Sequence, residues 1–182
     1  MPVPKISKPT IHDLRPISLL PVPSKILERL ITTQLTDYFT VAAGANQHGG
    51  IRGSSTTTAS IVIHEQVTKM LDDIDVTGVQ IMAYDLKKAF DSLGHAVILK
   101  RLIDCHFPPY FVNLMSSYLF DRTQSVRVDT SISEVVHVTS GISQGSVFGP
   151  LLFNAVCGGL KPLNSKYSII KYIDDITICV PL

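Results

Sequence analysis

The feature that most constrains this chain is a pair of adjacent aspartates inside an otherwise apolar, strand-forming stretch. Asp174 and Asp175 stand in the run Tyr-Ile-Asp-Asp-Ile-Thr-Ile of residues 172–178. Two unpaired carboxylates are costly to bury side by side, because burial removes their hydration. Neighbouring side chains on a strand point to opposite faces, so only a tight turn brings both carboxylates to one edge. The run therefore predicts two strands over residues 167–180, with the aspartates at their turn.

A third aspartate ends another predicted strand. Residues 78–85 have the alternation of a half-buried strand, and Asp85 closes it. A strand-end aspartate beside a hairpin Asp-Asp supplies the all-oxygen ligands that Mg²⁺ prefers. Two such ions about 3.5–4 Å apart form the clamp used in phosphoryl and nucleotidyl transfer. A plain surface turn is the competing interpretation of adjacent aspartates, and Asp72-Asp73 is an example of it in this chain.

The remaining pattern predicts helices around these strands. The chain has 182 residues, of which 45% are hydrophobic and 17% charged, which excludes general disorder. Apolar periodicity predicts helices over residues 22–39, 54–73, 91–105, 109–120 and 147–157, and paired strands over 123–129 and 134–140. The order of these elements predicts an α+β fold, with helices packed on one face of a mostly antiparallel sheet.

A glycine-rich segment joins a predicted strand to a predicted helix. Gly141, Gly145 and Gly149 lie in Ser-Gly-Ile-Ser-Gln-Gly-Ser-Val-Phe-Gly-Pro, residues 140–150. Glycine permits a close approach of the backbone, and the amides at a helix N-terminus can meet an anion. The Gly-Lys-Ser/Thr ending of a Walker loop is absent. The segment suits phosphate contact, although a structural turn explains it equally when it is taken alone.

Basic residues gather at the start of the chain and acidic residues in its middle. Residues 1–30 hold five Lys or Arg and two Asp or Glu, whereas residues 60–95 hold three and six. Cations of the kind of Arg15, Lys25 and Arg29 in this start, and of Arg52 in the glycine-containing loop, are suited to hold a triphosphate. When any of them is taken alone, a solvated surface is the simpler explanation.

Five segments in one order resemble the motifs of the reverse transcriptase domain of non-long-terminal-repeat (LINE-type) retrotransposons. Two resemble fingers motifs, one resembles the palm motif with the first metal-binding aspartate, and two match the motifs that follow it. They are Leu-Arg-Pro-Ile-Ser-Leu-Leu at 14–20, Asn-Gln-His-Gly-Gly-Ile-Arg-Gly-Ser-Ser-Thr-Thr at 46–57, Tyr-Asp-Leu-Lys-Lys-Ala-Phe-Asp-Ser-Leu-Gly-His at 84–95, 141–154, and Tyr-Ile-Asp-Asp at 172–175. The resemblance covers the chain from about residue 13 to its end.

The resemblance implies a catalytic site and its partners. Asp85, Asp174 and Asp175 would bind two Mg²⁺ ions, for which Mn²⁺ can substitute. The implied reaction is in-line attack of a primer 3′-hydroxyl on the α-phosphate of a deoxynucleoside triphosphate, so positioning and charge stabilisation carry the rate. The expected partners are an RNA template, a DNA primer and dNTPs, and no membrane.

The resemblance also implies residues that contact the nucleotide. Phe90 occupies the position that blocks a ribose 2′-hydroxyl, which selects deoxynucleotides. Gln144 and Gly145 would line the nucleotide pocket, and the triphosphate would face Arg15, Lys25 and, with less support, Arg52. Asp91 belongs to the family pattern, and we interpret it as a structural residue that caps the helix after it.

The implied organisation is that of a right-hand polymerase without its thumb. We expect a tail at 1–13, a fingers-like region at 14–75 and a palm at 76–182, whose antiparallel sheet is backed by helices. The chain ends seven residues after Asp175. The thumb and any endonuclease or RNase H domain of a longer polyprotein are therefore expected to be missing.

Several residues depart from the family pattern. Ile173 stands where a small residue, most often Ala, is usual, so we expect it to crowd the primer end. Ser143 replaces a usual Pro and Phe148 a usual Leu. Gly158-Gly159 is expected to weaken the preceding helix by ~1 kcal/mol per residue relative to Ala. Such drift fits a decayed copy.

Three other functions stay open. The chain fits an inert polymerase-like fragment with at most weak RNA binding, a template-independent nucleotidyl transferase or cyclase, or a module whose apolar face docks a partner. The two fingers motifs count against the second. We expect an intracellular protein, with the nucleus suggested by the family, because the N-terminus has no apolar signal core. No run of bases marks nuclear import.

Overall fold

The structure is a computed structural model that describes residues 2–4 and 14–182, and the side chains of 17–182. The chain forms two compact units, each built from two stretches of sequence. Unit 1 consists of Met1–Leu35 and Phe90–Gly149, and unit 2 of Thr36–Ala89 and Pro150–Leu182. The predicted fingers (14–75) and palm (76–182) are each one continuous range, so their boundary does not correspond to the division into these two units. The fingers and palm ranges stay predictions.

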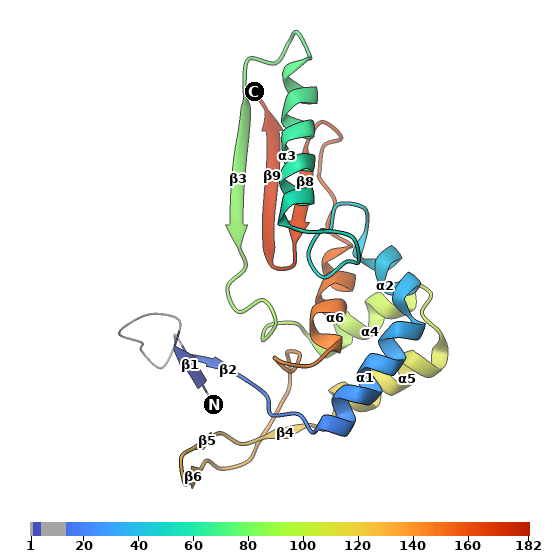
Figure 1. Cartoon of the computed structure of the whole chain (residues 1–182), viewed down its shortest axis with the longest axis vertical. Coiled ribbons are helices and arrows are strands. Elements are labelled where there is room, and N and C mark those ends of the chain that lie inside the picture. Colours follow the sequence, from blue (N-terminus) through green and yellow to red (C-terminus); the bar gives the residue numbers. More distant parts are fainter. Residues whose placement is uncertain (1, 5–13) are drawn as a thin grey trace. The chain divides into compact units, whose positions relative to one another are not determined.

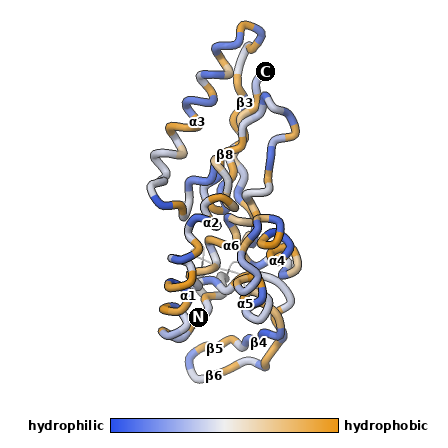
Figure 2. Tube along the Cα trace, turned by 90° about the vertical axis from the view of Figure 1, so that its right-hand side faces the viewer, coloured by the Kyte–Doolittle hydropathy of each residue, from blue (hydrophilic) through white to orange (hydrophobic). Residues whose placement is uncertain are grey.

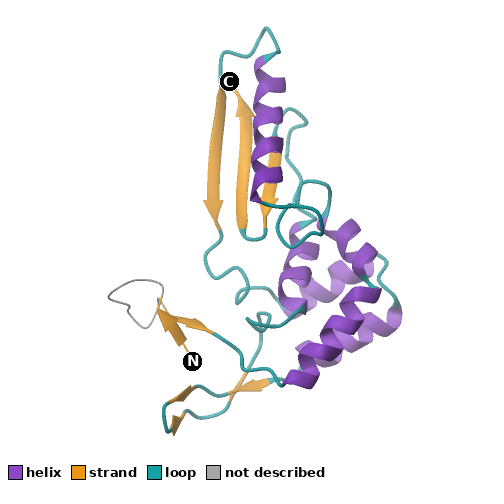
Figure 3. Ribbon diagram, in the orientation of Figure 1, coloured by secondary structure: helices purple, strands orange, loops and turns teal. Residues whose placement is uncertain are grey.

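Unit 2 contains a three-stranded antiparallel sheet (Figure 3). Its strands are β3 (Val79–Asp85), β8 (Ser168–Tyr172) and β9 (Asp175–Pro181), in the order β3-β9-β8. Tyr172 pairs with Asp175, which leaves Ile173 and Asp174 as a two-residue turn. The predicted strand at 78–85 and the predicted hairpin at 167–180 are confirmed.

One helix, α3 (Thr56–Leu71), lies along the β8–β9 part of this sheet (Figure 1). It begins with a capping box, because Ser55 Oγ accepts from Thr58 N and Thr58 Oγ1 accepts from Ser55 N. Apolar and polar residues alternate along it (Figure 2). The core beneath it is formed by Ala59, Ile170 and Cys179, with Val62, Ile63, Val67, Met70, Val79 and Tyr172 packed around them.

The rest of unit 2 is the helix α2 (Thr36–Ala43), the loop at 44–54 and the later turns of α6 (Phe148–Cys157). The expectation that Gly158 weakens α6 is wrong, because the helix ends at Cys157. A Cβ at Gly158 would instead overlap the carbonyl oxygen of Ala42. This glycine therefore lets the chain pass close to the end of α2.

Unit 1 is mainly helical, with α1 (Val22–Gln34), α4 (His95–Asp104), α5 (Pro109–Leu119) and the start of α6. The rings of Phe107 and Phe111 stack at 5.4 Å, and Phe111 and Phe148 meet edge to face at 5.8 Å. Three short strand pairs complete the unit: β1 (Pro2–Pro4) with β2 (Leu14–Pro16), β4 (Thr123–Gln124) with β7 (Val136–His137), and β5 (Arg127–Val128) with β6 (Ser131–Ile132).

Four predicted elements differ from those observed. The helix predicted over 22–39 is two helices, since α1 ends at Gln34 and Leu35 turns out of it with φ −107° and ψ 15°. The helix predicted over 91–105 begins only at His95. The strands predicted over 123–129 and 134–140 are present only as the two-residue strands β4, β5 and β7, and β5 pairs instead with β6 across the turn at Asp129, whose φ is +49°. No helix among residues 2–4 and 14–182 is long and apolar enough to cross a membrane.

Candidate active site

The three predicted metal-binding aspartates lie at one end of the sheet in unit 2. Asp85 ends β3 and Asp175 begins β9, and the two are direct partners in the antiparallel register. Directly opposite residues in such a pair have Cα atoms about 4.5–5.5 Å apart. Asp174 precedes Asp175 in the turn. Two strand pairings therefore bring together carboxylates that are separated by about half of the sequence.

The donor set at this sheet end suits Mg²⁺, because all its ligating atoms are carboxylate oxygens. Asp85 and Asp175 are exposed and Asp174 is half-buried. Among the described residues, no three His, Cys, Asp or Glu side chains converge closely enough to hold an ion. The fit to a metal thus rests on donor chemistry and strand register.

The turn that carries Asp174 has an unusual backbone. Ile173, its first residue, has a φ of +56°. A positive φ at this position is typical of the hairpin turns that favour glycine, and a β-branched residue there is a conformational outlier. Such a residue persists only where its surroundings over-determine the conformation. Here the flanking strands and the side chain of Gln47, whose Oε1 accepts from Ile173 N at 2.9 Å, supply that constraint.

A cavity of about 200 Å³ opens beside the aspartates, between the first turns of α3 and the turn end of β8 and β9. Asp175 lines it together with the hydroxyl-bearing residues Thr56, Ser60 and Tyr172. The cavity is entirely within unit 2. Its lining is more apolar than polar, because Ala59, Ile63 and Ile170 contribute to it as well.

A buried lysine lies two residues before the turn. Lys171 is 4% exposed, and its Nζ donates to the carbonyl oxygens of Cys157 at 3.1 Å and Ala43 at 3.5 Å. Burial raises the pKa of the Cys157 thiol to about 11. The charge of Lys171 acts against this rise, and the charge of Asp174 adds to it. Lys171 and Asp174 thus both lie within electrostatic reach of the Cys157 thiol.

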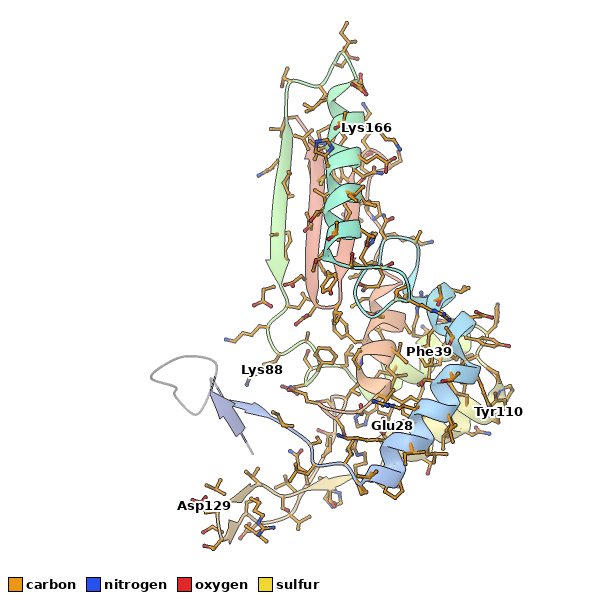
Figure 4. All side chains as sticks on the ribbon, in the orientation of Figure 1. Glu28, Phe39, Lys88, Tyr110, Asp129 and Lys166 are labelled. Atoms are coloured by element: carbon orange, nitrogen blue, oxygen red, sulfur yellow. The ribbon has the colours of Figure 1, made fainter. Side chains whose placement is uncertain are left out.

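Several predicted nucleotide contacts lie in unit 1, where two motif segments run side by side. Ile142 N donates to Phe90 O at 2.9 Å, and Gly141 N donates to Leu93 O at 2.8 Å. Ser18 N, from the first motif, donates to Gln144 O at 3.0 Å. Backbone hydrogen bonds thus join the motif at 141–154 to the motifs at 14–20 and 84–95. Lys88, which is labelled in Figure 4, lies in the loop that follows β3 and leads to Phe90.

Asp91 does not cap a helix, which corrects the sequence interpretation. α4 begins at His95, Gly94 is its N-cap, and no side chain caps it. Asp91 Oδ1 instead accepts from Gln144 Nε2 at 2.8 Å. The turn over residues 86–92 delays the start of the helix, so the aspartate is too early in the chain to cap it.

The remaining predicted residues are spread over the chain. Phe90 is half-buried, whereas Gly145 is exposed with a φ of +98°. Lys25 is exposed on α1 in unit 1, and Arg52 is exposed in the loop of unit 2. The side chain of Arg15 lies outside the described residues. The structure does not bring these three cations into one unit.

One departure from the family pattern acquires a structural role. The hydroxyl of Ser143 accepts a hydrogen bond from the guanidinium of Arg122, which also lies 5.2 Å from the centroid of the Tyr118 ring. Burial raises the pKa of the Tyr118 phenol, and Glu28 adds to the rise against the hydrogen bond from Ser146 and the charge of Arg122. Arg122 was not singled out by sequence, because a lone arginine after a helix carries no pattern.

Comparison with known proteins gives one family match, to "Reverse transcriptase (RNA-dependent DNA polymerase)", over residues 6–181. The chain is 32% identical over 176 residues to the probable RNA-directed DNA polymerase from transposon BS of Drosophila melanogaster, covering 92% of this chain and 19% of that protein. It is 33% identical over 149 residues to the RNA-directed DNA polymerase from mobile element jockey of the same species, covering 79% and 16%. The chain thus spans about a fifth of these relatives.

Solved structures with the same fold include two yeast telomerases. Apo telomerase from Candida tropicalis truncated from its C-terminal domain gives a TM-score of 0.59 at 12% identity, covering 86% of this chain and 33% of that one. Telomerase from Candida albicans in complex with a TWJ fragment of telomeric RNA gives 0.56 at 11%, covering 87% and 30%. At these identities the likeness shows a shared fold.

Proposed function

Because this chain belongs to the reverse transcriptase (RNA-dependent DNA polymerase) family, we propose that it carries the nucleotidyl-transfer centre of a retrotransposon polymerase. The resemblance to enzymes of non-long-terminal-repeat elements is confirmed by the relatives from Drosophila transposons. The predicted α+β fold with antiparallel sheets is confirmed as well. The proposal assigns chemistry to residues of this fold.

The observation that carries the proposal is the register that places Asp85, Asp174 and Asp175 at one sheet end. These carboxylates would hold two Mg²⁺ ions, with Mn²⁺ as a substitute. Bound there, the metal supplies a lowered pKa for the primer 3′-hydroxyl and charge neutralisation at the phosphates. The protein groups contribute position and charge, and no side chain acts as a nucleophile.

The proposed nucleotide contacts are the residues that the family resemblance implies. Phe90 would exclude a ribose 2′-hydroxyl, and its backbone is tied to the 140–146 segment by the Ile142 amide. Gln144 and Gly145 would line the pocket, with the Gln144 amide oriented by Asp91. The triphosphate would face Arg15, Lys25 and Arg52, because guanidinium and ammonium groups are the usual phosphate partners.

The proposed partners are an RNA template, a DNA primer and dNTPs. We assign residues 14–75 to the fingers and 76–182 to the palm, and expect the thumb in the remainder of a longer polyprotein. The matched stretches make up 19% and 16% of the two relatives, which supports that expectation. We place the reaction inside the cell, at chromosomal DNA in the nucleus.

Primer extension on an RNA template with Mg²⁺, and then with Mn²⁺, tests the proposal. The variant Asp174→Asn keeps the shape of the side chain and removes a metal ligand, so extension is expected to fall by at least about a hundredfold, a loss typical of removing one charge-stabilising group. Asp72→Asn is the matched control, because Asp72 is an exposed aspartate at the C-cap of α3. It is expected to keep the parent rate.

Equal extension by the parent and by Asp174→Asn would contradict the assignment of Asp174. No extension by a folded parent chain would contradict the proposed activity and favour the inert fragment. Grafting a related thumb onto the chain would then separate truncation from decay.

A further inference from the structure

We propose that Gln47 is a positioning residue for the metal-binding turn, acting from the loop at 44–54. The inference rests on the proposed function, because the turn matters to catalysis only if Asp174 and Asp175 bind metal. Gln47, the turn and their connecting contacts all lie in unit 2. Neither a charge nor an apolar pattern marks Gln47 in the sequence.

The side-chain oxygen of Gln47 joins the loop to the turn. Gln47 is 2% exposed, and its Oε1 accepts from Gly49 N and from Ile173 N, both at 2.9 Å. A carbonyl oxygen has two lone pairs, so these two amides saturate it. One side chain therefore fixes the distance between its own loop and the residue that precedes Asp174.

The backbone of the loop puts Gln47 in reach of the turn. Gln47 forms a parallel bridge with Lys171, in which Lys171 N donates to Asn46 O and His48 N donates to Lys171 O, both at 2.8 Å. Asn46 Nδ2 also donates to Ile169 O at 2.9 Å. The loop thus pairs with β8 along the edge that β9 does not occupy, and this pairing brings Gln47 beside the turn.

A second buried amide and a glycine hold the loop against the turn. Asn154 is 1% exposed and its Nδ2 donates to Gly49 O at 2.7 Å. A Cβ at Gly49 would lie 2.5 Å from Ile173 Cγ1 and 2.6 Å from Ile173 N. Only glycine permits this approach, so the loop packs directly on the turn residue.

The turn needs this support because of its conformation. Ile173 is β-branched and has a φ of +56°, which its side chain disfavours. Its N–H is half-buried and would lack a partner without Gln47. A relaxed φ at Ile173 would redirect the next residue, which is Asp174. The amide oxygen of Gln47 therefore holds a strained turn in the conformation that aims a metal ligand.

The chemistry of the side chain fits an acceptor role. Gln47 Nε2 is buried and makes no hydrogen bond among the described residues. The side chain therefore acts on the turn through its oxygen, which accepts from Ile173 N. A carboxylate at this position would add a negative charge beside Asp174 and Asp175. The neutral amide supplies the acceptor without adding to the repulsion between these carboxylates.

The test compares Gln47→Met with Gln66→Met in the full 182-residue chain. Methionine preserves the length of the side chain and removes the acceptor. Gln66 is a matched control, since its Oε1 accepts from Ser168 Oγ at 2.8 Å at the opposite end of β8. Amide hydrogen exchange at Ile173 is expected to accelerate at least tenfold in Gln47→Met and to stay at the parent rate in Gln66→Met.

The second readout is the Mg²⁺ concentration that gives half-maximal primer extension. It is expected to rise at least threefold in Gln47→Met and to stay unchanged in Gln66→Met. Faster exchange with an unchanged Mg²⁺ requirement would overturn the positioning role while leaving the proposed function intact. Unchanged exchange would overturn the inference outright. If Gln47→Met does not fold, Gln47→Asn, which is one methylene shorter, is expected to change both readouts in the same direction.

Failure of the proposed function has a different signature. A parent chain that extends no primer in any metal would contradict the polymerase assignment. The exchange comparison at Ile173 does not depend on activity, and would still decide whether Gln47 holds the turn.

Discussion

At the turn between β8 and β9, Ile173 adopts a left-handed backbone that costs a bulky residue of the order of 1–3 kcal/mol. The contacts that hold it come from Gln47 and Gly49, which lie more than a hundred residues earlier in the chain. The position of Asp174 therefore depends on groups outside its own hairpin. The expectation that Ile173 crowds a primer end stays a prediction.

The thiol of Cys157 makes stability depend on alkaline pH. Burial raises its pKa from 9.0 to about 11, with Asp174 adding to the rise and Lys171 opposing it. Between these values the folded chain binds more protons than the unfolded chain, so the free energy of unfolding falls as the pH rises. Urea denaturation at pH values below, within and above the range from 9.0 to about 11 measures this dependence. The free energy of unfolding is expected to fall less with rising pH in Cys157→Ala than in the parent.

Parallel pH profiles for the parent and Cys157→Ala would contradict this account. The comparison uses the pH dependence rather than the absolute stability, because removing the sulfur also leaves a small cavity. The cavity shifts the whole profile by a constant amount and leaves its slope unchanged.

At the scale of elements, α6 begins on a buried carboxylate. Glu28, on α1 (Figure 4), is 2% exposed, and its Oε2 accepts from Val147 N at 2.6 Å and Phe148 N at 3.4 Å. Tyr118 Oη donates to the other oxygen at 3.4 Å. A negative charge at a helix N-terminus is stabilising, because the first amides there lack partners within the helix. Glu28 thus joins α1 to α6 within unit 1.

Replacing Glu28 by Gln is expected to destabilise the chain by about 1–3 kcal/mol, because one acceptor oxygen and the charge are lost at a buried site. Glu65→Gln is the control, since Glu65 forms an exposed pair with Lys69 at 2.6 Å on α3. Such pairs contribute about 0.3–0.5 kcal/mol. Urea denaturation measures both, and equal losses in the two variants would contradict the capping role.

The elements that sequence predicted well are those whose pattern is set by their own burial. The apolar spacing in 54–73 matches α3, because one side of that helix packs on the core. The strand at 78–85 is present as β3, but its burial does not follow the predicted alternation, since Ile81 and Ala83 are exposed and Val79 is the β3 residue packed on the core cluster. The break at Leu35 and the late start of α4 were missed. The start of α4 follows the long-range pairing of Gly94 with Ser140, which hydrophobic periodicity does not record. The break at Leu35 is a local change of backbone conformation inside a continuous apolar pattern.

At the scale of the whole molecule, both units are assembled from two separated stretches of chain. The shared sheet end of the three aspartates could be predicted, because Asp85 ends one predicted strand and Asp174-Asp175 stand at the turn between two others. Their role as a metal site stays a prediction. The contacts of Gln47, Asn154 and Glu28 could not be predicted, because their partners lie 126, 105 and 119 residues away in sequence. Membership of the 46–57 motif was the one signal that pointed to Gln47.

The central claim is that the sheet end with Asp85, Asp174 and Asp175 binds the divalent metal. Mn²⁺ titration followed by electron paramagnetic resonance measures this without template, primer or thumb. The variant with all three aspartates changed to Asn is expected to bind Mn²⁺ at least tenfold more weakly than the parent. The matched control changes Asp72 and Asp73 to Asn, and is expected to bind like the parent. Equal affinity in the parent and the triple variant would contradict the account.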